Sequence, residues 1–191
     1  MSYAADLKSH NDKYVPTKTN GQLPLPPARK VAVLLCMDAR VIPEAALGIK
    51  EGEAHVIRNA GARATDAVRS LVISQQLLGT NEIVVIGHTD CGMETFTTEQ
   101  ARGIVTKSLS LDPSSEGGKY ISNFEFQEFP KVHANVVSDV AFLKSHELIK
   151  KETKISGWVR KGRQHQPGGL KRPCLISHLK TISPGTVHSR R

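Results

Sequence analysis

Short, continuous apolar stretches alternate with amphipathic stretches along the middle of this chain. Apolar runs of this length are typical of strands that are buried on both faces of a sheet. We predict such strands over 31–36, 54–58, 82–87 and 155–159. Helical spacing of apolar residues and capping signals predict helices over 43–47, 65–79, 91–102 and 131–149. The alternation indicates an α/β fold with a central, mostly parallel sheet of about four strands flanked by helices.

The segments outside this pattern divide the chain into three parts. Residues 1–29 are polar, end in a proline-rich stretch and are helical around 3–14, so we expect an N-terminal helical arm that has too few apolar groups to fold alone and needs a surface to pack on. Residues 30–159 form the α/β domain, in which 107–130 reads as a long excursion. Residues 160–191 form a basic, irregular C-terminal tail.

Composition excludes several classes of protein. The chain has 191 residues, of which 39% are hydrophobic and 23% are charged, as in an ordinary globular domain. Its apolar runs fall short of the roughly 18 residues that a transmembrane helix needs, and the first thirty residues contain no signal-peptide core. We therefore expect a cytoplasmic protein without a membrane partner.

The net charge of +8 belongs to the tail. All 18 acidic residues and 18 of the 26 basic residues lie in 1–159, so this part is neutral, whereas 160–191 is basic throughout. A basic tail can bind phosphate backbones, but because the domain is neutral we expect no nucleic-acid partner.

Two predicted strands end in residues that bind metals. The first ends at Cys36, and the third is followed by His88 and Cys91. Parallel sheets place their sites at the carboxyl ends of strands, where two thiolates and an imidazole suit tetrahedral Zn²⁺. Three protein ligands leave one position open, which is the pattern of a catalytic zinc. Cys174, in the tail, and Asp38 are alternative fourth ligands.

Asp38 has a second possible role, because Arg40 follows it by two residues. On an extended segment both side chains project to one side, so a guanidinium–carboxylate pair is feasible. Such a pair keeps Asp38 ionised and away from the metal.

Together these residues resemble a known family. Cys36-x-Asp38-x-Arg40 followed by His88-x-x-Cys91 is similar to the β-class carbonic anhydrases, as are two shorter motifs. These are Arg58-Asn59-Ala60-Gly61 and Ile155-Ser-Gly-Trp-Val159. His88-Thr-Asp-Cys-Gly-Met93 is similar to a short-chain branch that includes carbonyl sulfide (COS) hydrolases. After Val159 the chain departs from the family pattern.

The resemblance implies a zinc enzyme that reversibly hydrates CO₂ to bicarbonate. It implies Zn²⁺ on Cys36, His88 and Cys91, a gating dyad of Asp38 and Arg40, and a homodimer or higher homo-oligomer. Backbone amides near Gly92, at an expected helix N-terminus, are candidates for stabilising an oxyanion. His55 is one candidate for carrying the proton away.

Two other functions remain open from the sequence. A COS hydrolase would use the same zinc site on another linear molecule and release CO₂ and H₂S. A zinc-stabilised nucleic-acid-binding protein would use the 160–191 tail, but it would leave the Asp38–Arg40 pair without a role.

Overall fold

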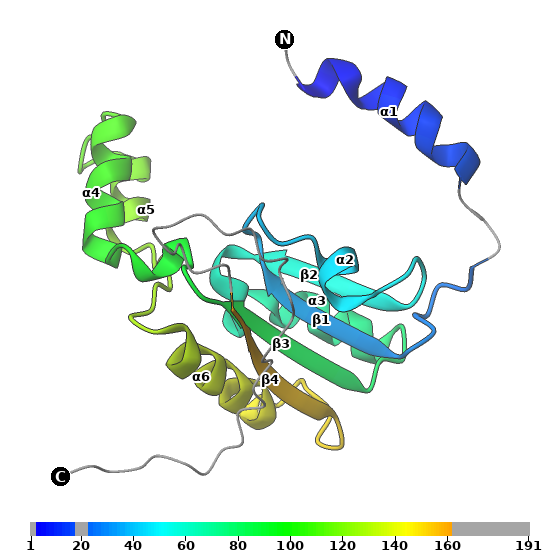
Figure 1. Cartoon of the computed structure of the whole chain (residues 1–191). Helices are drawn as coiled ribbons and strands as arrows, with labels where there is room; N and C mark the ends of the chain where they lie inside the picture. Colours follow the sequence, from blue (N-terminus) through cyan, green and yellow to red (C-terminus); the bar gives the residue numbers. More distant parts are fainter. Residues whose placement is uncertain (1–2, 18–22, 162–191) are drawn as a thin grey trace, which may run out of the picture.

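The computed structural model describes residues 3–17 and 23–161. Their centre is a four-stranded parallel sheet with the strand order β2-β1-β3-β4 (Figure 1). The strands are β1 (Val31–Cys36), β2 (Ala54–Asn59), β3 (Glu82–His88) and β4 (Lys154–Arg160). The prediction of a parallel sheet of four strands with flanking helices is confirmed.

Helices cover the two faces of this sheet unequally. The α-helices are α1 (Leu7–Tyr14), α2 (Pro43–Leu47), α3 (Ala64–Gln76), α4 (Thr98–Ser108), α5 (Glu116–Ser122) and α6 (Val132–Ser145). Helices α3 and α6 pack on one face and form the larger core with β1 and β3. On the other face a smaller cluster around Val33, Leu35 and Ile86 packs against Leu47 of α2.

The segment after β3 differs from the prediction. No single helix spans 91–102: Gly92–Glu94 form one 3₁₀ turn, and α4 begins only at Thr98. Thr97 starts α4 because its side chain and that of Gln100 form a reciprocal capping box. The predicted excursion 107–130 contains α5, whose N-terminal amides are capped by Ser115. Capping residues therefore mark the true starts of α4 and α5 in the sequence, and the prediction did not use them.

The close approach of α6 to the sheet depends on two strand glycines. A Cβ atom on Gly87 of β3 would lie 2.5 Å from Cγ2 of Val132, and one on Gly157 of β4 would lie 2.6 Å from Cγ1 of Val136. These distances are shorter than van der Waals contact, so only glycine lets α6 lie this close. Helix α6 therefore packs directly on β3, the strand that ends in His88.

The parallel register brings the candidate site residues to one edge of the sheet. Cys36, the last residue of β1, pairs with Asn59 of β2, and His88, the last residue of β3, pairs with Arg160 of β4. Strand β4 therefore runs one residue beyond the expected boundary at Val159. Residues 162–191, which include Cys174 and nearly all of the basic tail, lie outside the described residues.

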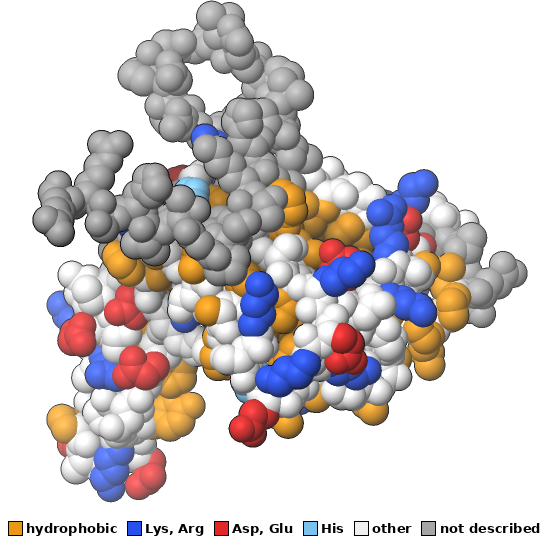
Figure 2. Space-filling view, turned by 90° about the horizontal axis from the view of Figure 1, so that it is seen from below, with side chains coloured by type: hydrophobic (Ala, Val, Ile, Leu, Met, Phe, Trp, Pro, Cys, Tyr) orange, Lys and Arg blue, Asp and Glu red, His pale blue; other side chains and the backbone are white. Residues whose placement is uncertain are grey.

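The length and hydropathy of the helices, and the distribution of charge on the surface, bear on the class of protein. Within the described residues, no helix is both long and apolar enough to cross a lipid bilayer. On the face in Figure 2, lysine and arginine side chains alternate with aspartate and glutamate side chains, and neither sign forms a continuous field. This mixture agrees with the neutral charge balance of residues 1–159.

Gly87→Ala is expected to lower the free energy of unfolding by about 2 kcal/mol, because the added methyl overpacks the contact with α6. Gly103→Ala in α4 is the matched control: its Cβ would meet no atom within 4 Å, so it should gain up to about 1 kcal/mol of helix propensity. Urea denaturation measures both changes. Equal stability of Gly87→Ala and the wild type would contradict this account of the packing.

Candidate metal centre

Three metal-binding side chains converge at the carboxyl edge of the sheet. One ligand atom each of Cys36, His88 and Cys91 lies within 4.8 Å of the other two, and the Sγ atoms of the two cysteines are 3.9 Å apart. All three side chains are buried. The structure therefore brings together the residues that the sequence singled out from two separate strand ends, and this cluster could hold a metal ion.

The histidine ring is oriented for coordination. Nδ1 of His88 lies 3.0 Å from the carbonyl oxygen of Thr89, an arrangement in which Nδ1–H donates and Nε2 keeps its lone pair. Nε2 is buried and has no hydrogen-bond partner among residues 3–17 and 23–161. Buried polar atoms are nearly always satisfied, so a free Nε2 beside two thiols fits a cation between them.

The cluster also favours negative charge on sulfur. The hydrogen bond with the Cys91 thiol lowers the pKa of Cys36 to about 4, and His88 and the backbone amides of Asp38 and Gly61 act in the same direction. The Cys36 thiolate in turn raises the pKa of Cys91. The pair therefore favours ionisation of Cys36 over Cys91, and a bound cation would favour the thiolate form of both.

Asp38 and Arg40 form the predicted pair beside the cluster. Nε of Arg40 lies 3.0 Å from Oδ1 of Asp38, and Nη2 lies 2.6 Å from Oδ2. These bonds hold the pKa of the Asp38 carboxyl well below its usual range. Oδ2 of Asp38 is only 3.7 Å from Nε2 of His88. An ionised carboxylate therefore lies next to the cluster and is held by a guanidinium.

Arg58 fixes the loop that carries both Cys36 and Asp38. From β2, its Nε donates to the Cys36 carbonyl at 3.0 Å and its Nη2 donates to the Asp38 carbonyl at 2.7 Å. The next turn contributes Gly61, which has φ 77° and lies so close to Phe129 that a Cβ would clash at 2.8 Å. Sequence reasoning used Arg58 only as part of a motif, although its place on the strand beside β1 was a usable signal.

Other expected site residues lie differently. Gly92 is exposed and begins a 3₁₀ turn rather than an α-helix, so the expected helix N-terminus is not there. His55 lies four positions before Asn59 on β2, roughly 13 Å from the end of that strand. Its Nδ1 is 2.7 Å from Oγ of Ser74, in a polar contact with α3. The structure therefore places His55 away from the metal-binding cluster.

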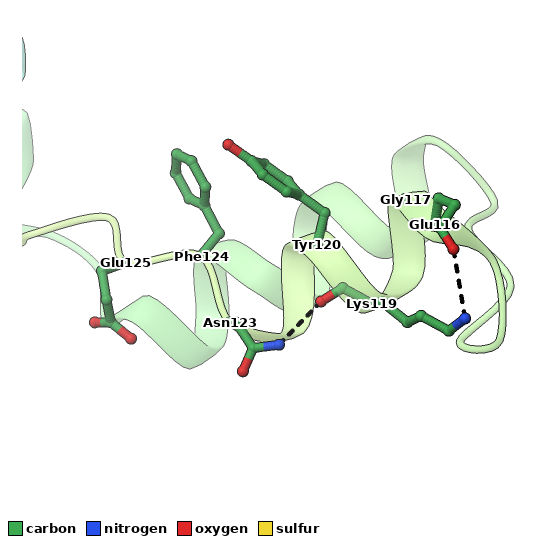
Figure 3. Close-up of a pocket in the computed structure, with 7 residues that line it drawn as sticks. All are labelled: Glu116, Gly117, Lys119, Tyr120, Asn123, Phe124 and Glu125. Carbon is green, nitrogen blue, oxygen red and sulfur yellow. Dashed lines mark hydrogen bonds and ion pairs between the residues drawn. The ribbon is translucent and has the colours of Figure 1, made fainter.

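A pocket of about 780 Å³ lies on α5, away from the metal-binding cluster. Figure 3 shows the rings of Tyr120 and Phe124 on the same side of this helix, with Lys119 paired to Glu116. Its lining includes no residue of the cluster or of the Asp38–Arg40 pair. The pocket therefore adds nothing to the chemistry at the sheet edge.

Comparison with known proteins decides the family. A family model described as "Carbonic anhydrase" matches residues 31–162. β-Carbonic anhydrase 1 of Mycobacterium tuberculosis is 38% identical over 160 residues, which cover 83% of this chain and 92% of that protein. The chain belongs to the β-carbonic anhydrase family. Its membership indicates an enzyme of the lyase or hydrolase type.

Two further relatives show the range of the family. A carbonic anhydrase structure from Glaciozyma antarctica is 50% identical and superposes with a TM-score of 0.78 over 84% of this chain and 94% of that one. The carbon disulfide hydrolase of Saccharolobus solfataricus is 37% identical over 181 residues, which cover 85% of this chain and 87% of that protein. The β-carbonic anhydrase family thus holds relatives of this chain that are named for two different reactions.

Arg58→Ala is expected to weaken metal affinity about tenfold, because it frees the carbonyls that fix the Cys36–Asp38 loop. Competition against a chelator of known affinity measures the change. Arg69→Ala, which removes an exposed arginine from α3, is the control and should leave the affinity unaltered. Equal affinities in the two variants would show that the clamp on the loop has no effect on the centre.

Proposed function

We propose that this protein is a zinc-dependent carbonic anhydrase that interconverts CO₂ and bicarbonate. The observation that carries the proposal is the convergence of Cys36, His88 and Cys91 beside a carboxylate that Arg40 already holds. Two thiolates and a neutral imidazole form a set that zinc prefers, and three protein ligands are typical of a catalytic rather than a structural site. The mycobacterial and Glaciozyma relatives, both named carbonic anhydrases, support the same reaction.

Each residue has a definite task in this proposal. Zinc supplies Lewis-acid chemistry, which makes hydroxide available from water near neutral pH. Asp38 is ionised and accepts hydrogen bonds only, so it can orient a reacting water through that water's proton. Arg40 keeps this carboxylate charged and at a fixed distance from the ligands. The backbone amide at Gly92 stays our candidate for an oxyanion donor, since Gly92 is exposed beside Cys91.

The comparison with carbon disulfide hydrolases supports a second class of substrate beside CO₂. Carbon disulfide hydrolases are among the similar proteins at 34–37% identity. CO₂, COS and CS₂ are all linear molecules with an electrophilic central carbon, so the same residues can serve a hydrolase of COS or CS₂. The alternative to CO₂ hydration is therefore hydrolysis of COS to CO₂ and H₂S at the same site.

The test is a paired assay on zinc-loaded protein. Stopped-flow CO₂ hydration and H₂S release from COS are measured on the wild type, Cys36→Ala and Asp38→Ala. We expect fast hydration by the wild type, loss of zinc and activity together in Cys36→Ala, and retained zinc with at least about a hundredfold lower turnover in Asp38→Ala.

Each other outcome has a clear meaning. Strong sulfide release with feeble hydration would make the protein a COS hydrolase. A wild type inactive in both assays despite bound zinc would contradict the proposed reaction, and a fully active Asp38→Ala variant would refute the role of the dyad.

We further propose that residues 1–29 pack on a second copy of the chain in a homodimer. Residues 3–17 contain no buried side chain, and Tyr3, Leu7 and Tyr14 are about half exposed or more. Figure 1 shows α1 apart from the sheet and its helices. An isolated helix of eight residues is unstable in water, so an apolar partner surface is needed to hold it.

Deletion of residues 1–22 is expected to shift the protein from dimer toward monomer, which sedimentation velocity measures. Lys8→Ala, which breaks only an exposed ion pair with Asp12, is the control and should stay dimeric. A deletion variant with the wild-type sedimentation coefficient, corrected for mass, would refute a role of the arm in assembly.

A further inference from the structure

Arg40 makes a second carboxylate contact that neither the family motif nor the dyad explains. Nη1 of Arg40 lies 2.7 Å from Oδ2 of Asp90, and Nη2 lies 2.7 Å from the backbone carbonyl oxygen of Asp90. Asp90 stands between His88 and Cys91, on the loop that follows β3. Arg40 therefore joins the two loops that carry the metal-binding side chains.

The two aspartates bind different edges of one planar group. Asp38 takes the edge formed by Nε and Nη2, and Asp90 takes the end formed by Nη1 and Nη2. A guanidinium offers five donors in a fixed fork, so bonds on both edges fix its position and its plane. Asp38 alone would hold Arg40, which is 60% exposed, by one edge of its guanidinium, and Asp90 adds the second edge.

The backbone at Asp90 suits this arrangement. Asp90 has φ 59°, in the left-handed region that aspartate and asparagine adopt more readily than most residues. Its side chain is 83% exposed, so it contributes little packing to the fold. Asp90 thus has an exposed side chain and an uncommon backbone conformation. Its carboxylate and its carbonyl oxygen both accept hydrogen bonds from Arg40, which indicates a role at that arginine.

We propose that Asp90 is a positioning residue of this site: it anchors Arg40 so that Arg40 keeps Asp38 away from the metal-binding cluster. The inference rests on the proposed function, in which Asp38 must remain free of the metal. Oδ2 of Asp38 lies 3.7 Å from Nε2 of His88, so a small movement of an unanchored pair brings the carboxylate among the ligands. In that position Asp38 would compete with the reacting water, and CO₂ would bind productively only to molecules in which Asp38 stays on Arg40.

Competition of this kind has a kinetic signature. If part of the enzyme carries Asp38 in the open position, the apparent substrate affinity falls by the fraction that remains competent. KM then rises while kcat at saturating substrate is retained. Simple damage to the fold has the opposite signature, because it removes active molecules and lowers kcat at an unchanged KM.

The test compares Asp90→Asn with the wild type and with Glu116→Gln. Asparagine keeps the size and the left-handed preference of Asp90 and removes its charge; Glu116→Gln removes a charge from α5, where Glu116 is 97% exposed. For Asp90→Asn we expect KM for CO₂ to rise about tenfold with kcat within about twofold of the wild type. Glu116→Gln should match the wild type in both constants.

A second readout does not depend on activity. The ¹H–¹⁵N signal of Arg40 Nε, assigned with Arg40→Lys, reports the motion of this guanidinium in metal-free or loaded protein. We expect a rigid group in the wild type, and a lower heteronuclear NOE in Asp90→Asn.

An unchanged NOE in Asp90→Asn overturns the inference, as does an unchanged KM or a fall in kcat alone. If the wild type is inactive with CO₂ and COS, the proposed function fails, and the NOE comparison still decides whether Asp90 anchors Arg40.

Discussion

The packing at the carboxyl edge of the sheet holds together a buried set of electron-pair donors. Two thiols and an imidazole nitrogen lie within 4.8 Å of one another at the carboxyl edge of the sheet. In the part of the chain that the structure describes, this nitrogen has no hydrogen-bond partner. Burying a polar atom without a hydrogen bond costs about 1–3 kcal/mol, and a buried thiolate costs more unless a positive charge faces it. A divalent cation at this place removes both costs at once, which is why the geometry favours a metal centre.

Three groups of contacts in the surrounding structure hold these metal-binding side chains in place. Gly87 and Gly157 let α6 lie close against β3 and β4. Arg58 holds the loop after β1 through hydrogen bonds to two carbonyl oxygens of that loop. Arg40 connects the same loop to the one after β3. Most of these contacts join elements that are far apart in sequence. The centre is therefore assembled only when the sheet register is correct, and an error of one residue would turn Cys36 or His88 to the opposite face.

Much of the fold and the cluster was predictable from local pattern. Four continuous apolar runs predict the strands, and the rule that parallel strands place chemistry at their carboxyl ends predicts that Cys36, His88 and Cys91 lie together. The helix after Cys91 was misplaced because its true start depends on the capping box at Thr97, a local signal that was overlooked. Asp90 was not predictable as a partner of Arg40, since that contact joins two loops and depends on an uncommon φ angle that no spacing rule reveals.

The most direct measurement is a crystal structure of the zinc-loaded protein with anomalous data collected at the zinc edge. The account expects one ion bound by Cys36, His88 and Cys91, with the Asp38 carboxylate still on Arg40 and a non-protein ligand in the fourth position. An ion at another place, or a centre closed by Asp38 or Cys174 as a fourth protein ligand at neutral pH, would contradict it.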